Sequence, residues 1–382
     1  MKTSTRRQQF TSRIAVPSLH MLWILALLFG LVVGMTGQGT VASAAPKAAP
    51  MTWTVLVGGE AEVEKQEMGP AGAWQFMRFY PDNITINDGD TIVFKLNSPE
   101  VHTVTFPKSG DKPPDLIIPE GGTSQRMLFN PLAVLPQGAA VYNGTALTGS
   151  GQLGGGPQFP TEYKLSFGKP GTYDYNCAFH PMMKGKVNVQ QAGSAYPKTQ
   201  AQVEAEAKAQ LAADTAAGKT ADAAAQTVLP SLPGPNGTTI HQVKVGYDDP
   251  SGNLSWMRFS PTDLTVDVGD TVEWIQQDPM APHTITFTSG GKDPEFVLVE
   301  PQKSGPPKLV ANPAVFGPVG GTTYSGKGYI NSGAMWGTKE STPGPRKYSL
   351  TFDTPGTYEY MCALHDMMGM YGHITVKPKG AS

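Results

Sequence analysis

Two fifteen-residue stretches decide the fold: residues 173–187 read YDYNCAFHPMMKGKV, and residues 358–372 read YEYMCALHDMMGMYG. Both begin with alternating aromatic residues, which is typical of a strand with one buried face. Each then has a cysteine, a histidine three positions later and methionines just beyond. Cys177 and Cys362 are the only cysteines of the 382-residue chain. One pattern therefore occurs twice, with the same chemistry after the same strand.

The match between the two copies extends far upstream of these stretches. The paired segments are MRFYP at 77–81 with MRFSP at 257–261, ITINDGDTIVF at 84–94 with LTVDVGDTVEW at 264–274, VHTVTF at 101–106 with PHTITF at 282–287, and YKLSF at 163–167 with YSLTF at 348–352. The offset between the copies stays almost constant from the first pair of segments to the paired cysteines. The chain is therefore an internal duplication of one domain.

The repeated segments predict an all-β protein. Their period-2 alternation marks strands, and Asp-Gly, Pro-Gly and Gly-Asp pairs mark the turns between them. Charged residues make up only 16% of the chain, with 44 glycines and 34 prolines, which suits short strands joined by many turns. We expect one β-sandwich domain over residues 51–191 and a second over residues 235–378.

The segments outside the repeated strands receive two expectations. Residues 192–234 form an Ala-rich linker whose helix formers predict a helix, with a weak apolar stripe through Val203, Ala207 and Leu211 and a break at Gly218. Residues 130–160 and 312–345 are rich in glycine and proline and longer than most structureless loops. We expect decorated surface loops there, with a lid that docks a partner as the alternative.

The N-terminal segment predicts export. Lys2, Arg6, Arg7 and Arg13 precede an apolar run at 21–35 and the sequence Ala-Ser-Ala at 42–44, a pattern typical of a signal peptide over residues 1–44. The apolar run is shorter than the roughly 20 residues that a spanning helix needs. We expect cleavage after Ala44 and a periplasmic or cell-surface protein, with a retained membrane anchor as the alternative.

The charge balance argues against a nucleic-acid partner. The whole chain has a net charge of −2, and removing the four basic residues of the leader leaves about −6. No basic patch is visible along the sequence.

The two cysteines have two interpretations. In an exported protein they predict a disulfide between Cys177 and Cys362. Each, however, has His180 or His365 three residues later and a second histidine, His102 or His283, on an upstream strand. A thiolate, two imidazoles and a thioether form the ligand set of a blue-copper site, and a disulfide would not need histidines at matched positions. We therefore favour copper.

At these residues the chain resembles the cupredoxins. The stretch CAFHPMMKGKV at 177–187 resembles the ligand loop of amicyanin, and CALHDMMGMYGHITV at 362–376 resembles that of plastocyanin and pseudoazurin. The resemblance implies two Greek-key β-sandwich domains and two type 1 copper sites cycling between Cu(I) and Cu(II). The implied ligands are His102, Cys177, His180 and Met183 in the first site, and His283, Cys362, His365 and Met370 in the second. Met182 and Met368 are the alternative axial ligands.

The chain departs from the family pattern beside these ligands. Thr103 and Thr284 stand where the family usually has an asparagine that braces the copper loop. Lys184 and Lys186 lie near the first site and Asp366 near the second, so we expect a higher reduction potential at the first site.

We expect an electron carrier whose partners are redox proteins, such as a cytochrome. The electron would pass through solvent-facing edges of His180 or His365, and an extended linker helix would hold the coppers about 30 Å or more apart. The alternatives are a copper oxidase or nitrite reductase, and a copper-binding protein without redox turnover. The enzymes need further histidines, often beside the copper cysteine, where Asn176 and Met361 stand here.

Overall fold

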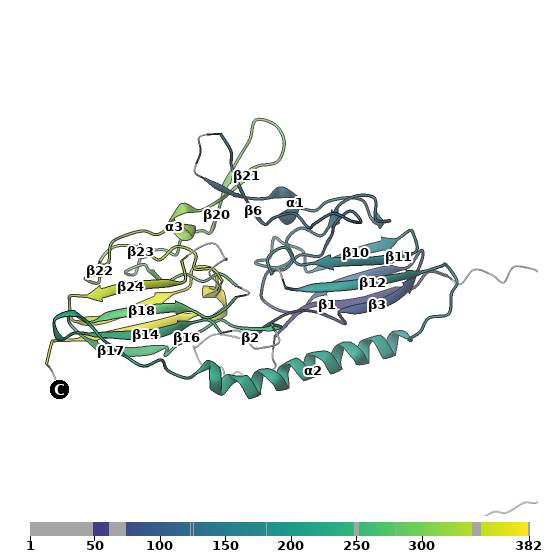
Figure 1. The fold of residues 1–382 in the computed structure, drawn as a ribbon. Coiled ribbons are helices and arrows are strands. Elements are labelled where there is room, and N and C mark those ends of the chain that lie inside the picture. The colour runs from purple at the N-terminus through teal and green to yellow at the C-terminus, as the bar shows by residue number, and fades with distance from the viewer. Residues whose placement is uncertain are drawn as a thin grey trace, which may run out of the picture. The chain divides into compact units, whose positions relative to one another are not determined.

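Each copy of the repeat folds as two β-sheets, drawn in Figure 1. The computed structural model describes residues 49–60, 74–122, 124, 126–180, 182–247, 252–279, 281–337 and 345–380. The expected signal peptide at 1–44 lies outside these residues. The all-β prediction with two sandwich domains is confirmed, and the chain crosses repeatedly between the two sheets, as in a Greek key.

The first domain has two five-stranded layers of its own. One runs β2 (Trp74–Tyr80), β1 (Thr52–Glu60), β4 (Thr91–Leu96), β10 (Glu162–Phe167) and β8 (Val141–Tyr142). The other runs β3 (Asn83–Asn87), β12 (Lys184–Gln190), β11 (Gly171–Asn176), β5 (Thr105–Phe106) and β9 (Thr148–Gly149). Strand β11 ends directly before Cys177, so the strand end sets where the ligand loop begins.

The second domain repeats this order. One sheet contains β13 (Leu232–Pro233), β14 (Thr239–Val245), β18 (Thr271–Gln276), β24 (Lys347–Phe352) and β22 (Thr323–Tyr324), with β16 (Phe259–Ser260) also on β14. The other contains β17 (Asp263–Asp267), β26 (Tyr371–Lys377), β25 (Gly356–Met361), β19 (Thr286–Phe287) and β23 (Ile330–Asn331). Strand β25 ends directly before Cys362.

Alternating side chains of these strands fill the core. In β11 the rings of Tyr173 and Tyr175 are buried while Asp174 between them is exposed. Tyr175 lies 4.8 Å, ring to ring, from Phe106, and the equivalent Tyr360 lies 5.2 Å from Phe287. The period of two that predicted the strands is therefore the period of the core.

The long Gly/Pro-rich segments are not surface loops alone, so that expectation was partly wrong. They contain the short helices α1 (Pro131–Val134) and α3 (Pro313–Phe316) and the edge strands β8, β9, β22 and β23. Isolated bridges pair Leu153 with His102 and Met335 with His283, and all four residues are buried. The segments thus return to the sandwich and cover the strands that carry the upstream histidines.

Two sheets contain strands from both domains. Strand β15 (Leu254–Trp256) of the second copy pairs with β2 of the first. Farther along, β6 (Ile117–Pro119) and β7 (Met127–Phe129) form a hairpin that joins the hairpin of β20 (Val297–Glu300) and β21 (Lys308–Ala311), with Val310 paired to Leu128. Residues 47–382 accordingly form one compact unit.

The expected helix of the linker is α2 (Gln200–Ala225), continuous in Figure 1. Thr199 caps it in a capping box with Gln202, and Val203 and Ala207 of the predicted stripe are buried. The expected break at Gly218 was wrong. The helix continues through this glycine, where an added Cβ would lie 2.6 Å from the Leu254 side chain, so the missing side chain allows close packing.

Helix α2 is bonded to both domains through the repeated Met-Arg-Phe motif. Asp214 pairs with Arg78 at 3.2 Å in the first copy, and Asp222 pairs with Arg258 at 3.3 Å in the second. Tyr80 also donates a 2.6 Å hydrogen bond to Asp214, and the indole of Trp256 donates one of 3.3 Å to Asp222. The helix therefore holds the two domains rather than merely spacing them.

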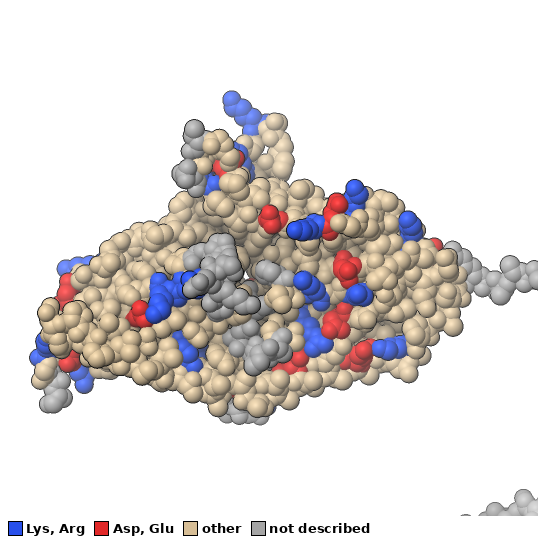
Figure 2. Space-filling view, viewed as in Figure 1, with Lys and Arg blue, Asp and Glu red and all other residues tan. Residues whose placement is uncertain are grey.

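The surface shows no concentration of one charge on the face drawn in Figure 2, where basic side chains (blue) and acidic side chains (red) are interspersed among wide uncharged areas. Within the described ranges, the helices are too short or too polar to span a bilayer. The apolar run at 21–35 lies outside those ranges.

Candidate metal centres

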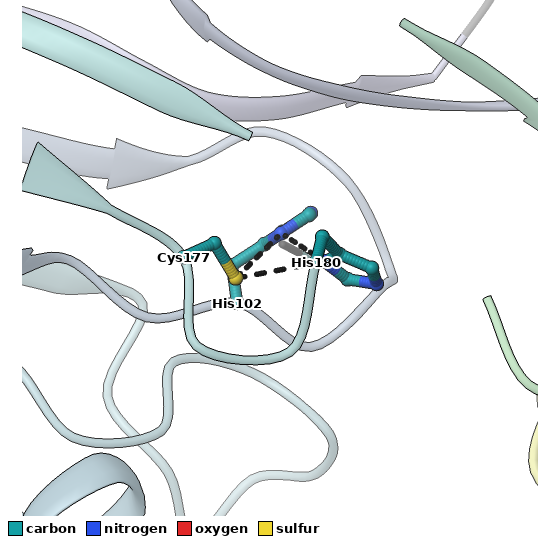
Figure 3. A group of neighbouring side chains, drawn as sticks. All are labelled: His102, Cys177 and His180. Atoms are coloured by element: carbon teal, nitrogen blue, oxygen red, sulfur yellow. Dashed lines mark hydrogen bonds between the residues drawn. The ribbon is translucent and has the colours of Figure 1, made fainter. Parts of the chain in front are cut away.

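Three buried side chains meet just after strand β11, as Figure 3 shows. The Nδ1 atom of His102 lies 3.8 Å from the Cys177 sulfur, and that of His180 lies 3.5 Å from it. The two Nδ1 atoms are 3.2 Å apart. The sequence places these residues on two separate segments, and the sandwich brings them together.

The second domain repeats the cluster with nearly the same dimensions. The Cys362 sulfur lies 3.8 Å from His283 Nδ1 and 3.4 Å from His365 Nδ1, and the two nitrogens are 3.1 Å apart. Over the described part of the chain, these two clusters are the groups of three or more metal-ligating residues.

Both clusters fit one metal ion each. Donors about 2.0 Å (nitrogen) and 2.3 Å (sulfur) from an ion and about 110° apart would be roughly 3.3 to 3.5 Å from one another. The observed distances surround that range. Both cysteines are free thiols rather than halves of a disulfide. Two imidazoles and one thiolate are the donor set that a trigonal copper site would use.

Methionines follow both clusters. Met183 and Met370 are 1% and 0% exposed, and their carbonyls accept hydrogen bonds of 3.0 Å from the backbone N–H groups of Cys177 and Cys362. Met182, by contrast, is 65% exposed. The buried methionines therefore lie in the same closed turns as the cysteines, and Met182 faces solvent.

Thr103 and Thr284, at the positions where an asparagine was expected from the family resemblance, form hydrogen bonds that brace the ligand loops. The Thr103 N–H donates to the Cys177 sulfur at 3.3 Å, while the Thr103 hydroxyl accepts a 2.7 Å hydrogen bond from the Ala178 N–H. Thr284 makes the same two bonds to Cys362 and Ala363, at 3.4 and 2.8 Å. These bonds orient the thiolate and tie the loop to the upstream histidine strand.

A glycine lies against each upstream histidine, and the sequence reasoning missed both. A Cβ at Gly58 would be 2.4 Å from His102 Nε2, and one at Gly246 would be 2.6 Å from His283 Nε2. Both glycines have positive φ, +69° and +62°. The available signal was a glycine at the end of a hydrophobic strand in both copies, which often marks a close approach.

The outward Nε2 atoms of the upstream histidines have different partners, another feature the sequence reasoning missed. His102 Nε2 lies 3.1 Å from the hydroxyl of Ser98, whereas His283 Nε2 lies 3.1 Å from the carboxylate of Asp278. Asp278 is fully buried and also accepts hydrogen bonds from the Ser255 hydroxyl and the Ala281 N–H. One cluster thus has a neutral neighbour and the other an acidic one.

The pKa values of the corresponding groups shift in opposite directions in the two clusters. Burial raises the pKa of Cys177 to about 11 and lowers that of His102 to about 3. In the second cluster burial also favours a higher cysteine pKa and a lower histidine pKa, but hydrogen bonds and neighbouring charges outweigh the effect of burial. The hydrogen bonds of His283 to Asp278 and Cys362 raise its pKa to about 9, and the charge of His365 with the His283 hydrogen bond takes the pKa of Cys362 well below normal.

The two loop histidines meet one shared carboxylate. His180 Nε2 lies 3.9 Å from one oxygen of Glu100, and His365 Nε2 lies 3.9 Å from the other. Glu100 is 4% exposed in its side chain, and burial raises its pKa although the charge of His365 opposes the shift. Sequence reasoning missed Glu100, because its counterpart in the second copy is the apolar Ala281.

Two expectations about these histidines were wrong. His180 and His365 are only 3% and 4% exposed, so neither presents a solvent-facing edge. Because both rings contact the same carboxylate, the metal sites are also much closer than an extended linker helix would place them. The reason is that α2 lies along both domains, so its length does not separate them.

The remaining described histidines have other partners. His241 Nε2 lies 3.1 Å from Asp270, and His373 Nδ1 lies 2.9 Å from Asp263. Neither residue belongs to a three-residue metal cluster in the described ranges.

Comparisons with known proteins find similar proteins for parts of this chain. The family model of copper-binding proteins of the plastocyanin/azurin family matches residues 67–190 and 245–377. A plastocyanin of Scenedesmus fuscus is 31% identical over 135 residues, which cover 35% of this chain and 97% of the plastocyanin. Among solved structures, a fern plastocyanin variant is 23% identical, covers 36% of this chain and 99% of its own, and has a TM-score of 0.21. A reduced amicyanin variant is 20% identical, with 36% and 82% coverage and a TM-score of 0.19.

The family model matches twice, once in each domain and around each His-Cys-His cluster. Together with the donor chemistry, this establishes two copper sites. The chain belongs to the plastocyanin/azurin family of copper-binding proteins.

Proposed function

We propose that this protein is an exported blue-copper electron carrier with one type 1 site in each domain. The proposed ligands are His102, Cys177, His180 and Met183 in the first site and His283, Cys362, His365 and Met370 in the second. The observation that carries the proposal is the pair of buried His-Cys-His clusters with matching dimensions. Bound copper would supply a one-electron couple between Cu(II) and Cu(I).

The protein's contribution is to hold the donors still. Each cysteine accepts a backbone hydrogen bond, and each ligand loop is tied to the upstream histidine strand through a threonine hydroxyl. Donors fixed in this way keep nearly the same positions in both oxidation states, which keeps the reorganisation small. Met183 and Met370 are favoured as weak axial ligands because both are buried in the closed turns.

The proposed boundaries are 51–191 and 235–378 for the two domains and 1–44 for a cleaved signal peptide. The partners proposed are redox proteins outside the cytoplasm, such as a cytochrome. Mass spectrometry of the protein purified from its native membranes and soluble fraction tests the export proposal. A mature N-terminus after Ala44 supports it, and a retained leader would favour the membrane-anchored form.

The visible and EPR spectra of the purified protein, together with a copper count, test the site proposal. We expect an intense blue band, narrow copper hyperfine splitting and about two coppers per chain. A colourless protein that binds copper only weakly would contradict the type 1 assignment.

Redox kinetics separate a carrier from the other functions. A carrier should be reduced and reoxidised quickly and reversibly by cytochromes. It should show no sustained turnover of oxygen or nitrite. Turnover that needs copper beyond two per chain would favour an oxidase or nitrite reductase. Slow reduction by every donor would favour copper binding without redox turnover.

A further inference from the structure

We propose that the two copper sites exchange electrons within the chain, across the contact of His180 and His365 with Glu100. The inference rests on the proposed electron-transfer function and goes beyond it. A carrier with two independent sites needs no internal route, whereas this geometry makes the two sites one redox unit.

The short distances from the two loop histidines to Glu100 limit how far apart the two copper sites can be. Each loop histidine reaches one oxygen of Glu100 at 3.9 Å, and the oxygens of one carboxylate are about 2.2 Å apart, so the two Nε2 atoms are at most about 10 Å apart. The ring and the metal–nitrogen bond add about 4 Å on each side, which limits the copper–copper distance to about 18 Å. Tunnelling rates fall exponentially with distance, so this path is far faster than one along the full length of an extended linker helix.

The three residues along this path are buried. His180, His365 and Glu100 are 3%, 4% and 3% exposed, which leaves the path shielded from water. A carboxylate at equal distances from both rings shifts both potentials in the same direction, so Glu100 does not favour either site. Its role is that of a positioning residue: one buried group keeps both imidazole edges beside each other.

Contacts between the two domains keep the length of this path constant, as efficient electron transfer along it requires. Three separate attachments join the two domains. Strand β15 extends the sheet of β2, α2 pairs with Arg78 and Arg258, and the two hairpins are joined by Arg126 with Glu300 and by Lys308 with Glu120 at 2.7 Å. The aromatic ring of Phe129 also packs 5.7 Å from that of Phe316.

The transfer itself is simple. One electron leaves the reduced site, which is oxidised, and enters the oxidised site, which is reduced; no bond forms or breaks and no proton moves. Its direction follows from the upstream histidines. The buried carboxylate of Asp278 favours the more positive oxidised state at the second site, whereas Ser98 is neutral. The electron therefore passes from the second site to the first.

Pulsed EPR on the fully oxidised protein tests the geometry without any turnover. The dipolar coupling between the two Cu(II) ions should correspond to a separation of at most about 18 Å. A separation clearly beyond this limit, or a distribution that extends well past it, would overturn the proposal.

Pulse radiolysis tests the transfer. Reduction by a small radical should be followed by a redistribution of the electron whose rate does not depend on protein concentration. Cys177→Ser, which removes one acceptor, should abolish this phase. A redistribution whose rate rises in proportion to protein concentration would show exchange between molecules and overturn the proposal.

Two carboxylate variants separate positioning from simple attachment of the domains. In Glu100→Gln, an amide N–H group faces one imidazole N–H donor. We expect the unimolecular phase to slow roughly tenfold, because the rate of electron transfer falls steeply when the two imidazole rings move apart. Glu120→Gln is the matched control, because it weakens another interdomain ion pair without touching either site. It should leave the phase within a factor of about two. Equal effects of the two variants would overturn the role of Glu100.

Failure of the inference remains distinguishable from failure of the proposed function. Two blue sites that are reduced reversibly by outside donors but show no unimolecular phase overturn only the internal route. Sites that never cycle reversibly overturn both.

Discussion

The two copper sites are nearly identical at their donors and different one step farther out. The donor distances of the two clusters almost coincide, as in the sulfur–nitrogen distances of 3.5 and 3.4 Å to the loop histidines. Yet His102 faces Ser98 whereas His283 faces Asp278, and Glu100 has no acidic counterpart in the second copy. The duplicated fold therefore preserves the ligand geometry while the outer partners differ, and we expect that difference to give the two sites different reduction potentials.

The largest expected effect is the loss of one site at a time. Cys177→Ser and Cys362→Ser should each remove about half of the blue absorption, because serine lacks the thiolate that gives the colour. Visible spectra and copper counts on both variants measure this. A single substitution that abolished both sites would show that the clusters are not separate units.

The next effect concerns the glycines beside the upstream histidines. Gly58→Ala and Gly246→Ala each place a Cβ within 2.6 Å of an imidazole nitrogen at a backbone conformation that alanine avoids. We expect about 2–3 kcal/mol of destabilisation in each case and a distorted copper spectrum. Gly110→Ala is a control, because it also has positive φ but no atom within 4 Å of the added Cβ. Denaturant unfolding measures the free energy of unfolding of the three variants. Equal losses of stability in all three would show that backbone strain alone, and not the contact with the imidazole, causes the destabilisation.

Exchanging the outer partners should move the potentials toward each other. A buried carboxylate about 7 Å from the metal at an effective dielectric constant of about 20 is worth about 2 kcal/mol, or roughly 100 mV for one electron. Asp278→Ser should therefore raise the potential of the second site, and Ser98→Asp should lower that of the first. Redox titration measures both shifts. A second site that is already the higher one in the unchanged protein would refute this electrostatic account.

This prediction sharpens the sequence-based expectation that the first site has the higher potential. Lys184, Lys186 and Asp366 argue in the same direction, but the lysines are exposed and screened by solvent. Substitutions that remove these three charges should change the reduction potentials less than Asp278→Ser does.

The smallest effect should be equal at the two sites. Thr103→Val and Thr284→Val remove the hydroxyl that accepts the Ala178 or Ala363 N–H, leaving a buried donor without its acceptor. We expect about 1–2 kcal/mol of destabilisation and a broader copper spectrum in each case. Thermal unfolding with copper bound measures it. A clear difference between the two variants would show that the sites are not braced alike.

Much of the fold was predictable because its signals are local. The alternation in β11 and β25, the turn residues and the repeated spacing predict two sandwiches, and the cysteine with a histidine three residues later predicts the loop donors. The linker helix and its buried stripe through Val203 and Ala207 were also predictable from composition and period. Gly218 was misjudged, because a glycine that breaks an isolated helix can instead allow close packing against Leu254.

By itself, the sequence determined the duplication, the all-β class and the residue types that hold copper, because each depends on short-range pattern and on side-chain chemistry. Only the tertiary structure decided which groups face the outward nitrogens of the histidines and how the two sites lie to each other. Those contacts join Glu100 to both loops and Asp278 to Ser255 on β15, which pairs with the first domain. No periodicity records such contacts, because they arise from how two folded copies pack.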